Sequence, residues 1–431
     1  MSFYISSSNY LYYIFILLFT LFTFYIFKKN IINQKNFEII SAYYLFFSLL
    51  LYYTLANNLL TLVFIFEFQS LIIIYIISNS FYLKNNSYLN FKKLNNYPIW
   101  YFNSLIYQFW TSFFSAILLT ISLLIFFKNF FFIDWINLEI YVYMLNLKFF
   151  KFNRIEILIY FTPLIFGFIL KLGLLPFFFW KPEIYKNFNL ELLFLYTTFY
   201  MFSLVYLIIF FFFNYFFLIN YIFIYFYYPI IIITLIFLPF LFYIITEIRM
   251  FIAYSSLFHI VLILISTVLN ERYIHLSFLY LFTYLFYITF FMLLLFYLSN
   301  FNIWYLSDIQ YFYNDQSINN IIINIFLGMA GLPPFLGFFS KISVIANLYF
   351  DKNYFLCILF LISSLIISFF YIQNSRFFGY SLKKTKYFKN NLVLIINYNY
   401  STVILLFLIF NTLNWLFLTS LLNFSYIIFL N

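Results

Sequence analysis

The amino-acid sequence predicts an all-α, polytopic integral membrane protein with about twelve transmembrane helices. Hydrophobic residues make up 66% of the chain and charged residues 8%, whereas soluble domains contain about 25% charged residues. Between polar connectors the apolar runs are continuous and reach the roughly 20 residues that a helix needs to cross a bilayer. The strands of a transmembrane barrel would be shorter and would alternate apolar with polar residues. The pattern therefore favours helices.

The predicted spans follow from cutting the chain at its polar connectors. They are residues 10–27, 39–55, 59–79, 101–127, 156–180, 190–213, 226–246, 251–269, 274–299, 319–347, 354–373 and 401–423. We interpret the first as a retained helix, because it lacks the basic region and the small-residue cleavage site of a signal peptide. Residues 130–150 are too polar to count as a span, and residues 300–318 have room for a lateral segment.

Composition and charge narrow the classes of function. The abundance of Phe (74) and Tyr (45) follows AT-rich codons, which indicates an organelle or a reduced genome such as that of an AT-rich protist. The formal charge of +10 comes largely from lysines in connectors such as residues 28–36 and 83–96, so it indicates loops on the positive side of a membrane and not a nucleic-acid partner. Cys357 is the single cysteine. With no Rossmann glycine pattern and no cysteine cluster, we expect no cofactor and no metal in this chain.

Three acidic or basic residues, the histidines apart, lie well inside predicted spans: Glu67, Lys171 and Lys341; others, such as Glu156 and Glu191, lie near span ends. A charge at the centre of a transmembrane helix costs roughly 2.5 to 3.5 kcal/mol, so such residues usually face an interior or a water-filled path. The alternative for each is a side chain that snorkels to the interface or a purely structural buried pair. Glu67 fits snorkelling least, because its short side chain has apolar residues on both sides.

Prolines accompany both lysines. Pro176 follows Lys171, and Pro333 and Pro334 precede Lys341. Because proline removes a backbone donor and clashes with the preceding turn, we expect both helices to break within the membrane. A pair of discontinuous helices in corresponding halves of a transporter marks its ion site, whereas a kink that only shapes packing is the simpler alternative for either helix alone.

Four segments together resemble the proton-channel subunits of respiratory complex I and their antiporter relatives. LKLGLLPFFFWKPEIY (170–185) is similar to the family signature K-x-x-x-x-P-F-H-x-W-x-P-x-x-Y, and AGLPPFLGFFSK (330–341) is similar to the second signature G-[LI]-P-P-x-x-G-F-x-x-K. EFQSLIIIY (67–75) resembles E-L-x-S-L-x-x-Y, and RMFIAYSSLFHI (249–260) resembles K-R-x-x-A-Y-S-S-[IL]-x-H. The four occur in the family's order.

The resemblance implies an architecture of two inverted five-helix repeats, each with a proline-broken helix and one half-channel. The expected divisions are an N-terminal helix and connector (1–38), a first repeat (39–213), a second repeat (214–373) and a C-terminal connector and helix (374–431).

The resemblance also implies the roles of single residues. Glu67 and Lys171 would form a charge pair that modulates proton binding by the lysine, and Lys341 would exchange protons with the opposite side. His259 is expected to relay protons, although a lone histidine in an apolar helix is more often a satisfied packing group. His275, near a span end, is a weaker candidate.

Two positions depart from the family pattern. Phe178 replaces the histidine of the first signature, and Tyr200 stands, by rough alignment, where the family usually has a further lysine. A tyrosine hydroxyl can order water and pass on hydrogen bonds, but with an ordinary pKa of about 10 it loads protons poorly. The sequence therefore leaves open a modified proton route through Tyr200 and a channel kept only for structure.

The function implied is proton translocation driven by NADH:ubiquinone oxidoreduction in partner subunits, which would carry FMN, iron–sulfur clusters and ubiquinone. Expected partners are complex I membrane-arm subunits, including subunit 4 and the small subunits 4L, 6 and 3, together with membrane lipids. The expected location is the mitochondrial inner membrane. The alternatives are a cation/proton antiporter that works alone and a structural membrane-arm subunit with an inactive channel.

Overall fold

The computed structural model describes ten stretches of the chain. These are residues 37–55, 58–87, 97–130, 154–188, 190–205, 220–268, 274–298, 305–306, 316–333 and 335–376. The predicted spans at 10–27 and 401–423 lie outside the described residues, as do Pro334 and the ambiguous residues 131–150.

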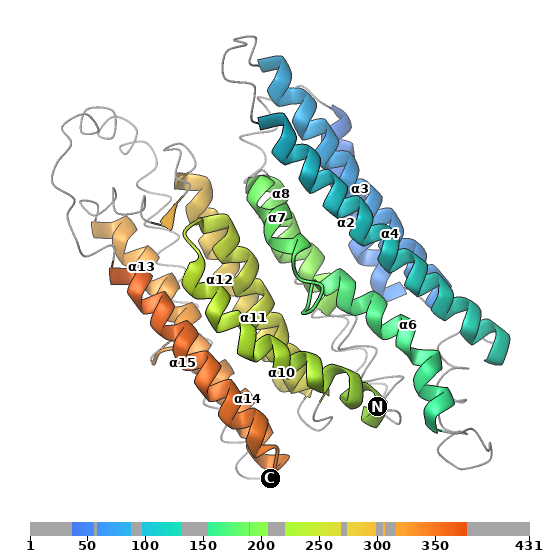
Figure 1. Cartoon of the computed structure of the whole chain (residues 1–431). Coiled ribbons are helices and arrows are strands. Elements are labelled where there is room, and N and C mark those ends of the chain that lie inside the picture. The colour runs from blue at the N-terminus through green and yellow to red at the C-terminus, as the bar shows by residue number, and fades with distance from the viewer. Residues whose placement is uncertain are drawn as a thin grey trace. The chain divides into compact units, whose positions relative to one another are not determined.

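The described residues fall into two compact units, one ending at Phe226 and one beginning at Tyr227. The expected boundary between residues 213 and 214 lies outside the described residues and stays a prediction. The helices up to Phe226 are α2 (Phe37–Leu55), α3 (Leu59–Ser87), α4 (Tyr97–Phe130), α6 (Arg154–Leu172), α7 (Trp180–Asn187), α8 (Leu190–Leu195) and the π-helical turn η2 (Tyr196–Tyr200). Within this unit α4 packs against α3, α6 and α7, and α2 packs against α3 (Figure 1).

The second unit has its own helical core. Its helices are α10 (Asn220–Ile244), which begins at the end of the first unit, α11 (Ile248–Val268), α12 (Ile274–Leu298), α13 (Gln316–Ala330), α14 (Leu336–Phe350) and α15 (Tyr354–Arg376). Here α12 contacts α11, α13 and α14, and α15 contacts α13 and α14 (Figure 1). Among the long apolar helices, α11 has the largest share of buried residues.

The structure confirms the all-α membrane fold with a broken helix in each unit. Five described helices, α3, α4, α10, α11 and α15, are long and apolar enough to cross a membrane, and shorter apolar helices lie between them. Helix α3 is an example of a helix suited to a membrane. An exposed apolar stripe at helical spacing is formed by Phe64, Phe68, Leu71 and Tyr75, while most of its other described side chains are buried or half-buried. An exposed face that is apolar is expected where lipid takes the place of water around a helix.

Both breaks begin at a glycine and not at a proline. Gly173 (φ +69°) follows α6, and Gly331 (φ +70°) follows α13. At each, the next residue's N–H donates to a carbonyl five residues back: Leu174 to Ile169 at 3.2 Å, and Leu332 to Leu327 at 3.3 Å. This is the Schellman ending, which needs a left-handed residue that only glycine adopts without strain.

Prolines elsewhere in the chain do not interrupt their helices. Pro163 lies inside α6, and Pro229 and Pro239 lie inside α10, which remain continuous. The expected breaks are therefore present, but proline alone does not cause them: glycine ends each helix, and the proline that follows prevents its continuation.

Glycines also allow the second broken helix to fold back closely. A Cβ at Gly337 would overlap the carbonyl oxygen of Gly328, and a Cβ at Gly328 would overlap the ring of Tyr287. We expect Gly337→Ala to lower the free energy of unfolding by about 2 kcal/mol or more through overpacking, measured by denaturation of the protein in detergent or bilayer.

Gly167→Ala is the matched control. Its Cβ would meet the Leu119 side chain at 3.0 Å, and a side chain can move where a backbone carbonyl cannot. Equal losses for the two variants would show that the α13–α14 approach does not depend on Gly337.

Candidate functional site

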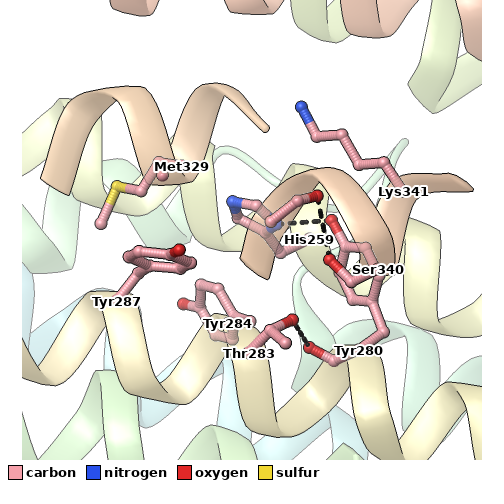
Figure 2. Close-up of a pocket in the computed structure, with 10 residues that line it drawn as sticks. His259, Tyr280, Thr283, Tyr284, Tyr287, Met329, Ser340 and Lys341 are labelled. Atoms are coloured by element: carbon pink, nitrogen blue, oxygen red, sulfur yellow. Dashed lines mark hydrogen bonds between the residues drawn. The ribbon is translucent and has the colours of Figure 1, made fainter. Parts of the chain in front are cut away.

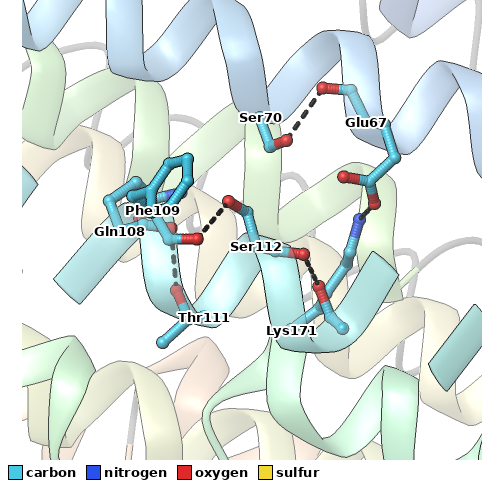
Figure 3. A network of polar contacts seen from close by, with 8 residues as sticks. Glu67, Ser70, Gln108, Phe109, Thr111, Ser112 and Lys171 are labelled. Carbon is cyan, nitrogen blue, oxygen red and sulfur yellow. Dashed lines mark hydrogen bonds and ion pairs between the residues drawn. The ribbon is translucent and has the colours of Figure 1, made fainter. Parts of the chain in front are cut away.

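The first site is an ion pair between α3 and the end of α6. Lys171 Nζ donates a hydrogen bond to Glu67 Oε1 at 2.9 Å (Figure 3). The Lys171 side chain is 2% exposed and that of Glu67 is 27% exposed. The ammonium group is thus enclosed by protein, whereas its carboxylate partner has access to the surroundings.

Local structure explains the position of the Lys171 ammonium group. It belongs to the last turn of α6, where the unpaired carbonyls of a helix favour a cation. Its Nζ also lies 4.5 Å from the centroid of the Phe66 ring, whose face attracts a positive charge. Phe66 and Glu67 are neighbours on α3, so this helix supplies both partners of the ammonium.

Tyr200 lies close to this pair, at the end of the π-helical turn η2. The residue is 3% exposed, and its ring lies 4.6 Å from that of Tyr196 between centroids at an interplanar angle of 34°. Glu67 interacts electrostatically with its hydroxyl. Isolated π turns inside helices occur frequently at functional sites. Here the turn brings two tyrosines together beside the ion pair.

Phe178, the other departure from the family pattern, lies in the break between α6 and α7. It is 7% exposed, and its ring lies 4.2 Å from that of Phe179. An apolar ring therefore occupies this position, and it contributes no titratable group to the first break.

The second site surrounds Lys341 on α14. Its Nζ donates a hydrogen bond to the carbonyl oxygen of Ala330 at 2.6 Å, which is the open end of α13. The residue is 7% exposed, and its Nζ lies 5.8 Å from the centroid of the Phe258 ring. Lys341 forms no salt bridge within the described part of the chain.

His259 on α11 lies in the same pocket as Lys341 (Figure 2). Its Nδ1 is hydrogen-bonded to the hydroxyl of Tyr280 at 2.8 Å, and Lys341 is within electrostatic range of its ring. Among the described residues, its buried Nε2 has no hydrogen-bond partner. One ring nitrogen of His259, Nδ1, therefore has a hydrogen-bond partner, and the other, Nε2, is available to bind another group.

The pocket has room for about one water molecule. Its cavity volume is about 10 Å³, which is near the lower limit for holding one water. Lys341, His259, Ser340, Thr283 and several tyrosines line it, so polar partners are present. The pocket can hold a water next to the His259 imidazole, and a bridging water is one way to transfer a proton over a gap.

The structure thus gathers the sequence candidates within each unit: Glu67 and Lys171 with Tyr200 in the first, and Lys341 with His259 in the second. Pro176 and Pro333 lie in the breaks, while Pro334 and the side chain of His275 lie outside the described residues. Sequence reasoning missed Tyr280, Tyr284 and a wholly buried lysine, Lys181. Tyrosines carry little signal in a chain with 45 of them.

The chain matches the family model described as NADH:quinone oxidoreductase/Mrp antiporter, transmembrane region, over residues 56–367. It is 31% identical over 135 residues to NADH-quinone oxidoreductase subunit N of Francisella tularensis subsp. holarctica, covering 30% of this chain and 27% of the relative. It is 34% identical over 160 residues to NADH-ubiquinone oxidoreductase chain 2 of Anopheles gambiae, covering 36% of this chain and 42% of the relative. The matches therefore span less than half of either relative.

The fold is similar to a chain of respiratory complex I from Thermus thermophilus. The TM-score is 0.58 at 15% identity, and the match covers 77% of this chain and 69% of that chain. At this identity the likeness concerns the fold alone.

The Glu67–Lys171 pair makes a stability prediction. Glu67→Gln leaves a buried ammonium without its carboxylate and should lower the free energy of unfolding by about 3 kcal/mol. Lys171→Met should cost less, because the Glu67 side chain is 27% exposed and its carboxylate is not left enclosed by protein. In the double variant no charge is stranded, so its loss should be smaller than the sum of the two single losses.

The three variants are compared by denaturation in one lipid or detergent. Strictly additive losses would show that the 2.9 Å contact does not couple the two residues energetically.

Proposed function

The chain belongs to the NADH:quinone oxidoreductase/Mrp antiporter family of transmembrane proteins, and we propose that it is a proton-translocating membrane-arm subunit of a respiratory NADH:quinone oxidoreductase. The observation that carries the proposal is the placement of a buried lysine at each of two broken helices, Lys171 at the end of α6 and Lys341 against the end of α13. Buried ionisable groups beside interrupted helices are the arrangement that membrane ion pathways use.

In the first unit the ion pair sets how strongly Lys171 holds a proton. A carboxylate next to a lysine favours the ammonium form, and burial without such a partner favours the neutral amine. Movement of Glu67 away from Lys171 would therefore release a proton, and its return would capture one. Tyr200, whose hydroxyl is within electrostatic range of Glu67, is placed to pass hydrogen bonds onward.

In the second unit Lys341 plays the corresponding part with a different partner. Its amine is bonded to a backbone carbonyl, which accepts a hydrogen bond from either protonation state. His259 and a single water in the shared pocket would take up or supply the proton. The Tyr280 hydroxyl orients the imidazole through its bond to Nδ1.

The oxidation of NADH belongs, in this proposal, to partner subunits that carry FMN, iron–sulfur clusters and ubiquinone. This chain would supply no redox group and would act as a non-redox part of the enzyme. The proposed partners are the membrane-arm subunits named above, in the mitochondrial inner membrane. Among paralogues we favour subunit 2, because Lys341 ends the second signature where subunit 4 typically has glutamate.

The proposal predicts that Glu67→Gln and Lys341→Met each slow proton translocation and quinone-linked NADH oxidation by about tenfold or more. The reason is that a positioned proton-transfer group contributes on the order of a hundredfold to the step it serves. Both rates are measured in sealed membranes that carry the assembled complex.

Lys128→Met is the control, because Lys128 is exposed at the end of α4 and should have no effect. Full coupled activity in both Glu67→Gln and Lys341→Met would instead support an inactive, structural subunit, the reading that Phe178 and Tyr200 favour.

A second candidate function rests on the antiporter members of the same family. If the chain is a cation/proton antiporter, the purified protein alone should exchange cations for protons in vesicles. We expect no exchange by the isolated chain and proton translocation only in an NADH-oxidising complex. Exchange by the chain alone that is lost in Lys341→Met would favour the antiporter.

A further inference from the structure

Lys181 is a second buried lysine of the first unit, and the function proposed above does not use it. It lies in the first turn of α7 and is 0% exposed. Its Nζ contacts the carbonyl oxygen of Leu172 at 3.5 Å, the sulfur of Met201 at 3.9 Å and the face of Tyr185 at 5.8 Å from the centroid. A lysine that is wholly buried without a carboxylate needs an explanation.

The surroundings of Lys181 repeat those of Lys341. Lys341 leaves the second segment of its broken helix and donates to Ala330, the last residue of α13. Lys181 likewise leaves the second segment of its own broken helix and reaches Leu172, the last residue of α6. Each amine therefore lies on the open carbonyl end of the preceding helix, where the backbone favours a proton-bearing group.

The glycines of the two breaks show the same correspondence. The position that a Cβ would take at Gly173 lies 3.3 Å from Cδ of Lys181, and the equivalent position at Gly331 lies 2.7 Å from Cδ of Lys341. The left-handed glycine of each Schellman ending thus leaves room for the stem of a lysine. The local sequences agree as well, GLLPF at 173–177 and GLPPF at 331–335.

The partners of Lys181 allow its amine to gain and lose a proton. Among the described residues no carboxylate contacts its Nζ, and its neighbours are a carbonyl, a thioether and an aromatic face. A carbonyl accepts a hydrogen bond from an amine as well as from an ammonium, so neither state is locked. A buried lysine without a fixed counter-charge changes protonation readily.

Tyrosines join Lys181 to the Glu67–Lys171 pair. Tyr185 follows Lys181 by one helical turn, and its ring lies 5.6 Å from that of Tyr196, which in turn lies 4.6 Å from Tyr200. Tyr200 is within electrostatic range of Glu67. The side chains of Tyr196 and Tyr200 are within hydrogen-bonding reach of each other, so their hydroxyls can pass on hydrogen bonds.

We propose that Lys181 is a proton-binding site of the first unit, equivalent in place to Lys341 of the second, and that Tyr185, Tyr196 and Tyr200 connect it to the Glu67–Lys171 pair. The inference rests on the proposed function and adds a site to it. It also gives Tyr200 a role as a link between two amines. The amine of Lys181 comes from α7 and contacts Met201, the residue next to Tyr200.

The competing reading is structural, with Lys181 as a fixed cation or donor that caps α6. Two variants separate the readings. Lys181→Gln keeps a side-chain donor for the Leu172 carbonyl but cannot bind the proton. Lys181→Arg keeps the donor and a permanent positive charge, because arginine does not release its proton in proteins.

The experiment measures protons translocated per NADH oxidised, and the amount of assembled complex, in membranes carrying each variant. We expect Lys181→Gln and Lys181→Arg both to assemble and both to lose proton translocation to an extent comparable with Lys341→Met. Tyr196→Phe, which keeps the ring and removes the hydroxyl, should reduce the rate in the same direction. Lys128→Gln, at an exposed position, should behave as wild type.

Three results would overturn the inference. They are wild-type translocation in Lys181→Gln, wild-type translocation in Lys181→Arg, and failure of both variants to assemble, since a cap or fixed cation would explain each. If Glu67→Gln and Lys341→Met impair translocation while the Lys181 variants do not, the proposed function stands and this site is wrong. If none of the variants impairs translocation, the proposed function itself fails.

Discussion

The constraint on which the structure depends is that backbone carbonyls inside a membrane must find a donor. Water is absent from the hydrocarbon, so an interrupted helix is tolerated only where protein or enclosed water satisfies its ends. In this chain each interrupted helix ends in a glycine Schellman motif, and a lysine from beyond the break reaches the last carbonyl. One lysine side chain at each break thus donates to the last carbonyl of the helix and places a protonatable amine there.

This arrangement links stability with function. An amine that caps a helix end is held by packing around its stem, as the close approach of Gly331 to Lys341 shows. In the proposed mechanism its proton is nevertheless exchangeable, because a carbonyl is an adequate partner for both protonation states. Lys171 differs, since its partner is the carboxylate of Glu67, whose charge strengthens proton binding. The first unit therefore contains a lysine with a counter-charge and one without, so the two amines of the proposed relay would hold a proton with different strength.

Much of the candidate site could be predicted from the sequence, because charged residues within membrane-spanning segments are rare and easily recognised. Glu67, Lys171 and Lys341 interrupt long apolar runs, so their cost in the membrane marks them without any knowledge of the fold. Lys181 escaped because it belongs to WKPEIYKN (180–187), whose polar residues resemble a connector. Its burial comes from tertiary contacts, such as those of its Nζ with the Leu172 carbonyl and the Met201 sulfur, and no local pattern encodes those contacts.

Hydropathy, together with residues that cannot continue a helix, was enough to predict the membrane environment, the helical class and the presence of two breaks. Tertiary structure decided where each break begins and which polar groups meet. Pro163, Pro229 and Pro239 lie in unbroken helices, so the decisive feature is the left-handed glycine, a property of backbone conformation. Likewise the Glu67–Lys171 contact joins residues 104 positions apart, and only the folded chain brings such residues within hydrogen-bond distance.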